Sequence, residues 1–190
     1  IISKAFEERK KQNRSALLSY TVACDPDFST SLEIMHKIAN NGATALEIGI
    51  PHNCAVGEGE RIQNAIDRVL KNNTRIEDVF NLVKEFRKSN KETPVIFMLY
   101  YNSALQYGED KFIEISNEIG VNGFIIVDFP FPQNLDFASK CRAKDIVFIQ
   151  LISPTTDDDR IKNVMSKADM VYYISMLSTT GGKLKVSPNE

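Results

Sequence analysis

Short, almost continuously apolar segments alternate along the chain with amphipathic, charged segments. The apolar segments are rich in β-branched and aromatic residues, and they span residues 16–22, 44–50, 94–101, 123–128, 146–152 and 170–175. Uninterrupted apolar runs of this length are typical of strands that are buried on both faces. The pattern therefore predicts six buried strands.

The segments between these runs carry apolar residues at helical spacing. Ser29–Ser31 offers an N-cap for the first of these helices, and Gly42 ends it. Further helices are predicted around 59–71, 76–89, 112–120, 135–143 and 157–168. Alternating strands and helices favour a parallel sheet with right-handed crossovers. Pattern alone leaves two architectures open, an open doubly wound sheet and a closed barrel of eight units.

Composition narrows the class of protein. The chain has 190 residues, 43% hydrophobic and 25% charged, which fits a globular protein and excludes collagen-like, coiled-coil and disordered chains. A net charge of −2 gives no sign of the strongly basic surface that binds nucleic acid or an anionic membrane. No apolar run approaches the roughly 18 residues of a membrane span. Three scattered cysteines, Cys24, Cys54 and Cys141, argue against a disulfide framework and favour a reducing, cytoplasmic location.

One predicted strand contains a carboxylate. Glu47 interrupts the apolar run 44–50, and a buried carboxylate costs several kcal/mol unless it is paired or protonated. Burial should raise its pKa, which suits a general acid or base. A structural glutamate satisfied by a backbone group or a hydroxyl remains an alternative.

Two loops at the carboxyl ends of strands hold further candidates. Residues 50–60 contain two glycines. Glu58 lies in this loop just before the next helix, and it could act chemically or simply stabilise that helix through its dipole. His52, Cys54 and Glu58 are metal-ligating residue types, but their spacing matches no well-defined site, so no metal is predicted. Residues 179–183 could hold phosphate through backbone N–H groups or form a plain turn.

Several motifs in this order resemble the tryptophan synthase alpha subunit family. The resemblance runs from about residue 3 to residue 183 and favours the (β/α)8 barrel over the open sheet. The matching motifs are Tyr20–Pro26, Ala45–Pro51, Gly59 with Ile62–Ala65, Tyr100–Asn102, Gly123–Pro130, Ser153–Thr156, and Tyr172–Ser175 with Thr180 and Gly181.

The resemblance implies a lyase that splits indole-3-glycerol phosphate into indole and glyceraldehyde 3-phosphate. In that reaction Glu47 would be the general acid/base, and Glu58 would stand where the family has an aspartate that contacts the indole N–H. The remaining residues implied to bind substrate are Tyr20, Ile62, Met98, Ile125, Val127, Leu151, Tyr172, Thr180 and Gly181, the last facing the phosphate.

The resemblance also implies a partner. The chain itself would need no cofactor, and pyridoxal phosphate would belong to a beta subunit in an alpha2beta2 assembly in the cytoplasm. Two other functions stay open: a catalytically impaired alpha-like protein that binds and regulates a beta subunit, and a different barrel enzyme acting on a phosphate substrate.

Some residues depart from the family pattern. Glu58 is one methylene longer than the usual aspartate, and a misplacement of about 1 Å can cost about 100-fold in rate. Two prolines are lost and Gly57 replaces an alanine, so we expect a looser loop. Cys54 replaces the aspartate that usually touches the partner. Cys24 and Ser178 replace glycines, at about 1 kcal/mol or more wherever φ must be positive.

The chain is short for this fold, since eight units usually need roughly 250 residues. We expect residues 1–190 to form one barrel domain that holds about six of the eight units. Strands seven and eight, with most of the phosphate-binding glycines, would then be missing. Two exposed sheet edges would follow, and such edges invite pairing with other chains.

Overall fold

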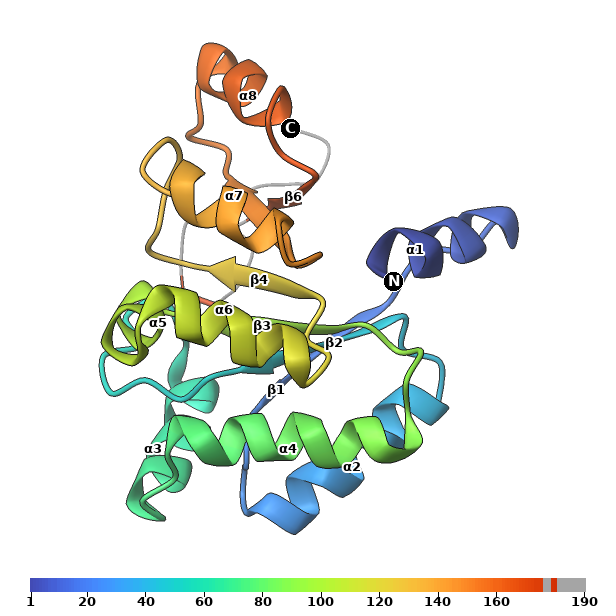
Figure 1. The fold of residues 1–190 in the computed structure, drawn as a ribbon, viewed down its shortest axis with the longest axis vertical. Helices are drawn as coiled ribbons and strands as arrows, with labels where there is room; N and C mark the ends of the chain where they lie inside the picture. Colours follow the sequence, from blue (N-terminus) through green and yellow to red (C-terminus); the bar gives the residue numbers. More distant parts are fainter. Residues whose placement is uncertain (176–178, 181–190) are drawn as a thin grey trace.

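The computed structural model describes residues 1–175 together with Thr179 and Thr180 (Figure 1). Within these residues, eight helices and six strands follow one another along the chain. Their order is α1 (Ile2–Lys11), β1 (Leu18–Val22), α2 (Phe28–Asn40), β2 (Ala45–Gly49), α3 (Glu60–Lys71), α4 (Ile76–Ser89), β3 (Val95–Leu99), α5 (Tyr101–Tyr107), α6 (Glu109–Glu118), β4 (Gly123–Ile126), α7 (Leu135–Arg142), β5 (Val147–Ile152), α8 (Asp158–Met165) and β6 (Met170–Tyr173).

The order of the strands decides between the two architectures. Within the described residues all the strands are parallel, and they pair in sequence order from β1 to β6. A doubly wound sheet would start in its middle and reverse direction at a switch point. Neighbours in strict sequence order are instead those of a (β/α)8 barrel. The predicted barrel with about six of its units is confirmed.

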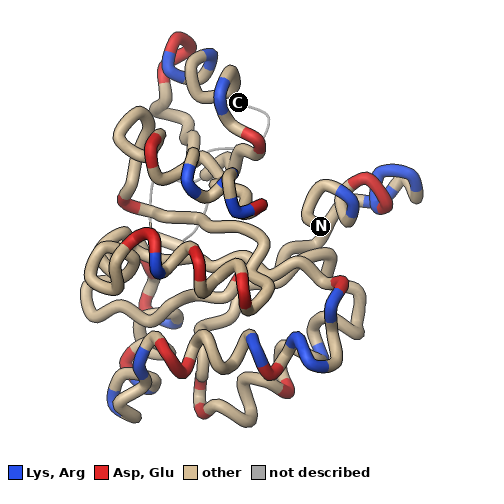
Figure 2. The backbone as a smooth tube through the Cα atoms, in the orientation of Figure 1, with Lys and Arg blue, Asp and Glu red and all other residues tan. Residues whose placement is uncertain are grey.

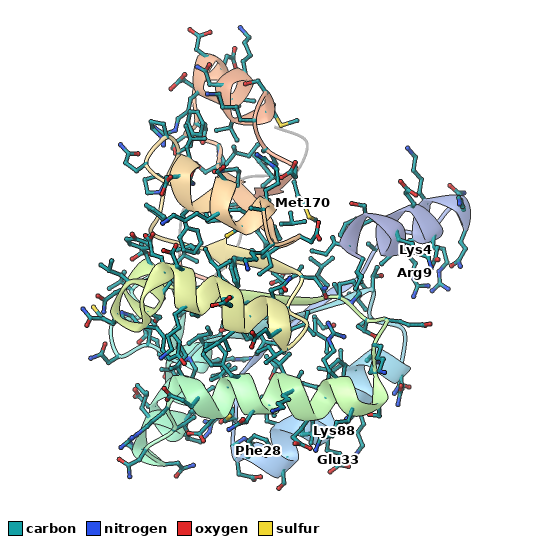
Figure 3. The ribbon with its side chains drawn as sticks, viewed as in Figure 1. Lys4, Arg9, Phe28, Glu33, Lys88 and Met170 are labelled. Atoms are coloured by element: carbon teal, nitrogen blue, oxygen red, sulfur yellow. The ribbon has the colours of Figure 1, made fainter. Side chains whose placement is uncertain are left out.

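The pleat of each strand separates two cores. On β2, Leu46 and Ile48 point outward and pack beneath the helices, in one cluster with residues of α4 such as Leu82. Ala45 points to the inner side, where it meets Ile2 of α1. The inner cluster also contains Ile96, Ile125 and Ile149, and Met170 on β6 packs against it (labelled in Figure 3).

Charged residues follow the same division. Figure 2 shows Lys, Arg, Asp and Glu concentrated on the helices and loops, whereas the strands are almost free of them.

Helix α1 extends away from the other helices in Figure 1, but its residue Ile2 is only 4% exposed. A Cβ added to Gly123 would lie 3.1 Å from Cδ1 of Ile2. Helix α1 is therefore anchored to the inner face of the sheet through its first residue.

Two sequence predictions about element ends were wrong. The third strand ends at Leu99, and Tyr101, predicted as strand, begins α5. The backbone N–H of Tyr101 donates to Oδ1 of Asp128 at 2.7 Å, so a residue that follows the neighbouring strand caps this helix. Helix α2 is capped by Asp27, whose carboxylate accepts from the N–H of Thr30, and not by Ser29–Ser31.

The backbone at Cys24 is left-handed, with φ of 63°. A residue other than glycine at this position therefore costs about 1 kcal/mol or more in stability. The N–H of Cys24 donates to Oγ of Ser31 at 3.0 Å, which anchors the turn to α2. Ser178, the other replaced glycine, lies outside the described residues.

The amino-terminal ends of β3 and β4 are tied together by one guanidinium group. Arg87 on α4 donates to the carbonyl oxygens of Thr93 and Gly120 at 2.7 and 2.8 Å, and to Oδ1 of Asn122 at 2.9 Å. Burial lowers the pKa of Arg87 to about 10. The charge is balanced by carbonyl dipoles, and these acceptors lose their partner if the side chain is shortened.

We predict that Arg87→Ala lowers the free energy of unfolding by about 2–4 kcal/mol, because it leaves several acceptors without a donor. Lys88→Ala is the matched control. Its side chain is 65% exposed in a surface ion pair with Glu85 (Lys88 is labelled in Figure 3), so the change should stay within about 0.5 kcal/mol. Urea denaturation of both variants checks this, and equal losses would contradict it.

Candidate active site

A cavity of about 580 Å³ opens at the carboxyl ends of the strands. Apolar side chains make up most of its wall, and two carboxylates face it. This is the end of a parallel barrel at which functional residues gather. The lining residues are Tyr20, Glu47, Gly57, Glu58, Ile62, Met98, Ile125, Val127, Leu151, Tyr172, Tyr173, Ile174, Ser175 and Thr180.

Glu47 is placed in this cavity by the strand pleat. It pairs in register with Tyr20 on β1 and Ile96 on β3, and like them it belongs to the inner face. The residue is only 6% exposed. Burial raises the pKa of its carboxyl, and no cation among the described residues forms an ion pair with it. A carboxyl in this setting holds its proton more tightly than one in water, which suits proton transfer to and from a ligand.

Glu58 approaches the same cavity from the loop between β2 and α3. Burial raises the pKa of its carboxyl, and a hydrogen bond with Thr180 partly offsets that rise. One carboxyl oxygen, Oε2, is buried and has no hydrogen-bond partner among the described residues. An unpaired buried acceptor is costly, and this cost disfavours the ionised form of the carboxyl.

The loop that carries Glu58 is held by hydrogen bonds with Tyr100, Thr180 and Gln63, and that it is looser than the loop of the family stays a prediction. The N–H of Gly57 donates to the phenol oxygen of Tyr100 at 2.9 Å, and its carbonyl oxygen accepts from the N–H of Thr180 at 3.1 Å. The amide of Gln63 donates to the carbonyl oxygen of Glu58 at 2.8 Å. Gly59 allows the backbone of Thr180 to approach the loop closely, because a Cβ at this position would overlap the carbonyl oxygen of Thr180.

The structure brings almost all of the substrate-binding residues implied by the resemblance to this one cavity. Gly181 is the exception, because it lies outside the described residues. The cavity is also lined by Gly57, Tyr173, Ile174 and Ser175, to which the sequence assigned no role in binding. Strand alternation would select only one of Tyr172 and Tyr173, and the chain leaves β6 after Tyr173, so periodicity gives no signal for the residues beyond it.

Other polar residues at strand ends have structural roles. Tyr101 stacks on Phe129 with ring centroids 3.9 Å apart, and its phenol donates to Glu109. His52 stacks on Tyr100, and Cys54 is exposed; neither lines the cavity. The described residues hold no cluster of three or more His, Cys, Asp or Glu side chains suited to a metal ion. That the chain binds no metal stays a prediction.

The wall beside Glu47 contains a tight contact. The ring of Tyr20 lies against Gly49, and a Cβ added there would overlap the phenol oxygen and stand 2.7 Å from Cζ. Gly49 therefore leaves the space in which this tyrosine lies, and any larger residue would push the ring into the cavity.

We predict that Gly49→Ala lowers the free energy of unfolding by about 1–3 kcal/mol, since it overpacks the wall. The same change made in a Tyr20→Leu background should cost less than about 1 kcal/mol, because the overlapping ring atoms are gone. A double-mutant cycle by urea denaturation measures the coupling. Equal effects in the two backgrounds would show that the contact is not the cause.

A second prediction concerns Glu47 and pH. A pKa raised by folding makes the native state less stable once the carboxyl ionises, so this group favours folding only at low pH. We expect Glu47→Gln to unfold with a higher free energy than wild type above the folded-state pKa. The advantage should vanish as pH falls below the ordinary carboxyl pKa of 4.5. Glu60→Gln, at an exposed position nearby, should show no such change. Denaturation across pH decides between the two patterns.

No helix in the described part of the chain combines the length and apolar character required to cross a membrane.

Known proteins share this sequence and fold. The family model described as tryptophan synthase alpha chain matches residues 6–189. A tryptophan synthase alpha chain from Pelagibacter ubique is 53% identical over 191 residues, an alignment that covers 100% of this chain and 72% of that relative.

Solved structures give the same answer. The crystal structure of tryptophan synthase subunit alpha from Legionella pneumophila superposes with a TM-score of 0.88 at 36% identity, covering 92% of this chain and 67% of that one. A chain of the tryptophan synthase a2b2 complex from Pyrococcus furiosus superposes with a TM-score of 0.78 at 31% identity, covering 83% and 67%. The agreement between family model, relatives and barrel structure shows that this chain belongs to the tryptophan synthase alpha chain family.

Proposed function

We propose that the cavity cleaves indole-3-glycerol phosphate into indole and glyceraldehyde 3-phosphate, as a carbon–carbon lyase of tryptophan biosynthesis. One observation carries the proposal: in a chain of this family, two buried carboxylates from different elements, Glu47 and Glu58, face one largely apolar cavity. An indole ring needs an apolar wall, and the reaction at its edge needs groups that move protons.

The chemistry divides between the two carboxylates. Breaking the bond between the indole ring and the glycerol chain requires a proton for the ring carbon. It also requires removal of the proton from the hydroxyl that becomes the aldehyde. We assign proton transfer to Glu47, because it lines the cavity and its burial raises the pKa of the carboxyl.

Glu58 takes the second role. Its carboxylate lines the cavity and can accept the indole N–H, which stabilises the ring as charge develops on it. Thr180 holds the loop that delivers this carboxylate, and the isolated bridge between Glu58 and Thr180 joins the two segments. The extra methylene of Glu58 therefore does not keep the carboxylate away from the cavity, and no observation on the described residues favours an impaired, purely regulatory protein.

The partner proposed for this chain is a tryptophan synthase beta subunit. The Pyrococcus furiosus relative comes from an a2b2 complex of tryptophan synthase, which supports such an assembly. We further propose that this chain needs no cofactor of its own, that pyridoxal phosphate is held by the beta partner, and that the assembly is cytoplasmic.

We expect purified protein to release indole from indole-3-glycerol phosphate, and Glu47→Gln to lower kcat by about 100- to 10,000-fold, as the loss of a general acid/base does. A spectrophotometric assay for indole, with and without a beta subunit, measures this. Glu60→Gln is the matched control, because this neighbouring carboxylate is exposed and does not line the cavity. If the wild-type protein is active and Glu47→Gln leaves kcat unchanged, the role assigned to Glu47 is wrong.

A further inference from the structure

Tyr100 connects both ends of the loop that carries Glu58. It follows directly after β3 and is only 7% exposed. Its ring stacks on His52 at the start of the loop, with centroids 5.0 Å apart and planes 20° apart. Its phenol oxygen accepts the N–H of Gly57 near the end of the loop. One side chain thus spans the segment that the loss of two prolines would otherwise leave free.

The hydrogen bond lies one residue before the carboxylate. The N–H of Gly57 is held by Tyr100, and the carbonyl oxygen of the same residue is held by Thr180. Gln63 then fixes the carbonyl oxygen of Glu58. With the peptide groups on both sides held, the direction in which the Glu58 side chain leaves the backbone is fixed.

Gly57 leaves room for this geometry. A Cβ at this position would stand 3.2 Å from the phenol oxygen of Tyr100, which is tighter than ordinary van der Waals contact. The absence of a side chain therefore lets the phenol reach the backbone. The glycine that suggests looseness in the sequence is the residue that permits the fastening.

Tyr100 does not line the cavity, so its hydroxyl cannot act on a ligand there directly. Burial raises the pKa of the phenol, which keeps it neutral. Because Tyr100 contacts the loop and not the cavity, any influence on chemistry must pass through the residues that it holds.

We propose that Tyr100 is a positioning residue that sets the direction of the Glu58 carboxylate through the Gly57 amide. This inference rests on the proposed function, in which Glu58 accepts the indole N–H. Tyr100 directly follows β3, so the geometry of the loop after β2 depends on a residue at the end of the neighbouring strand.

Tyr100→Phe tests the inference, because it removes the acceptor and retains the ring that stacks on His52. We expect kcat for indole release to fall about 10- to 100-fold, as slight misplacement of a reacting group does, with a smaller change in KM. Tyr107→Phe is the matched control. Its ring packs edge-on against Phe80, outside the cavity, and the change should leave kcat unaltered.

A positioning role also predicts how Tyr100→Phe behaves when Glu58 is already replaced. In a Glu58→Gln background the substitution Tyr100→Phe should lower kcat little further, because the group that it positions is already lost. A merely structural role would lower kcat by the same factor in both backgrounds. Full additivity, or wild-type kcat in Tyr100→Phe, would overturn the inference.

Hydrogen exchange separates this inference from the proposed function. Amides of residues 53–60 should exchange at least severalfold faster in Tyr100→Phe than in wild type and Tyr107→Phe, whether or not indole is released. If wild type releases no indole, the proposed function fails and faster exchange still supports the fastening. Unchanged exchange in this segment overturns the inference in either case.

Discussion

The site depends on the burial of two carboxylates that form no ion pair with any cation among the described residues. Glu47 and Glu58 are 6% and 4% exposed, and burial raises the pKa of both. In water such groups would be ionised and would hold protons only weakly. The apolar inner face of the sheet makes ionisation costly, and that cost is what gives a carboxyl the proton affinity of an acid/base catalyst.

The two carboxylates are held by different means. Glu47 is fixed by a strand, since the pleat of β2 leaves it only the inner face and its neighbours in register are Tyr20 and Ile96. Glu58 is fixed by a loop, so its position needs contacts from elsewhere. Those contacts come from Tyr100 after β3 and Thr180 after β6. The position of Glu58 thus depends on residues that are distant in the sequence.

These differences explain how much could be predicted from the sequence. The strands could be predicted because each is an apolar run buried on both faces, and Glu47 stood out because it interrupts such a run. The start of α5 could not, since Tyr101 continues an apolar run and the residue that caps its N–H, Asp128, follows a different strand. The barrel emerged from strand order and from family motifs, because periodicity alone fits both architectures.

The loop after β2 shows what local reasoning could not predict. Gly57 and the missing prolines increase the freedom of the unfolded chain, and local sequence therefore predicts looseness. In the folded chain the same glycine admits the Tyr100 phenol, and Gly59 admits the backbone of Thr180. A side chain at position 59 would block the approach of Thr180, whereas a side chain at position 57 would only crowd the Tyr100 phenol. The contacts that hold this loop are therefore tertiary, and they come from residues that follow β3 and β6.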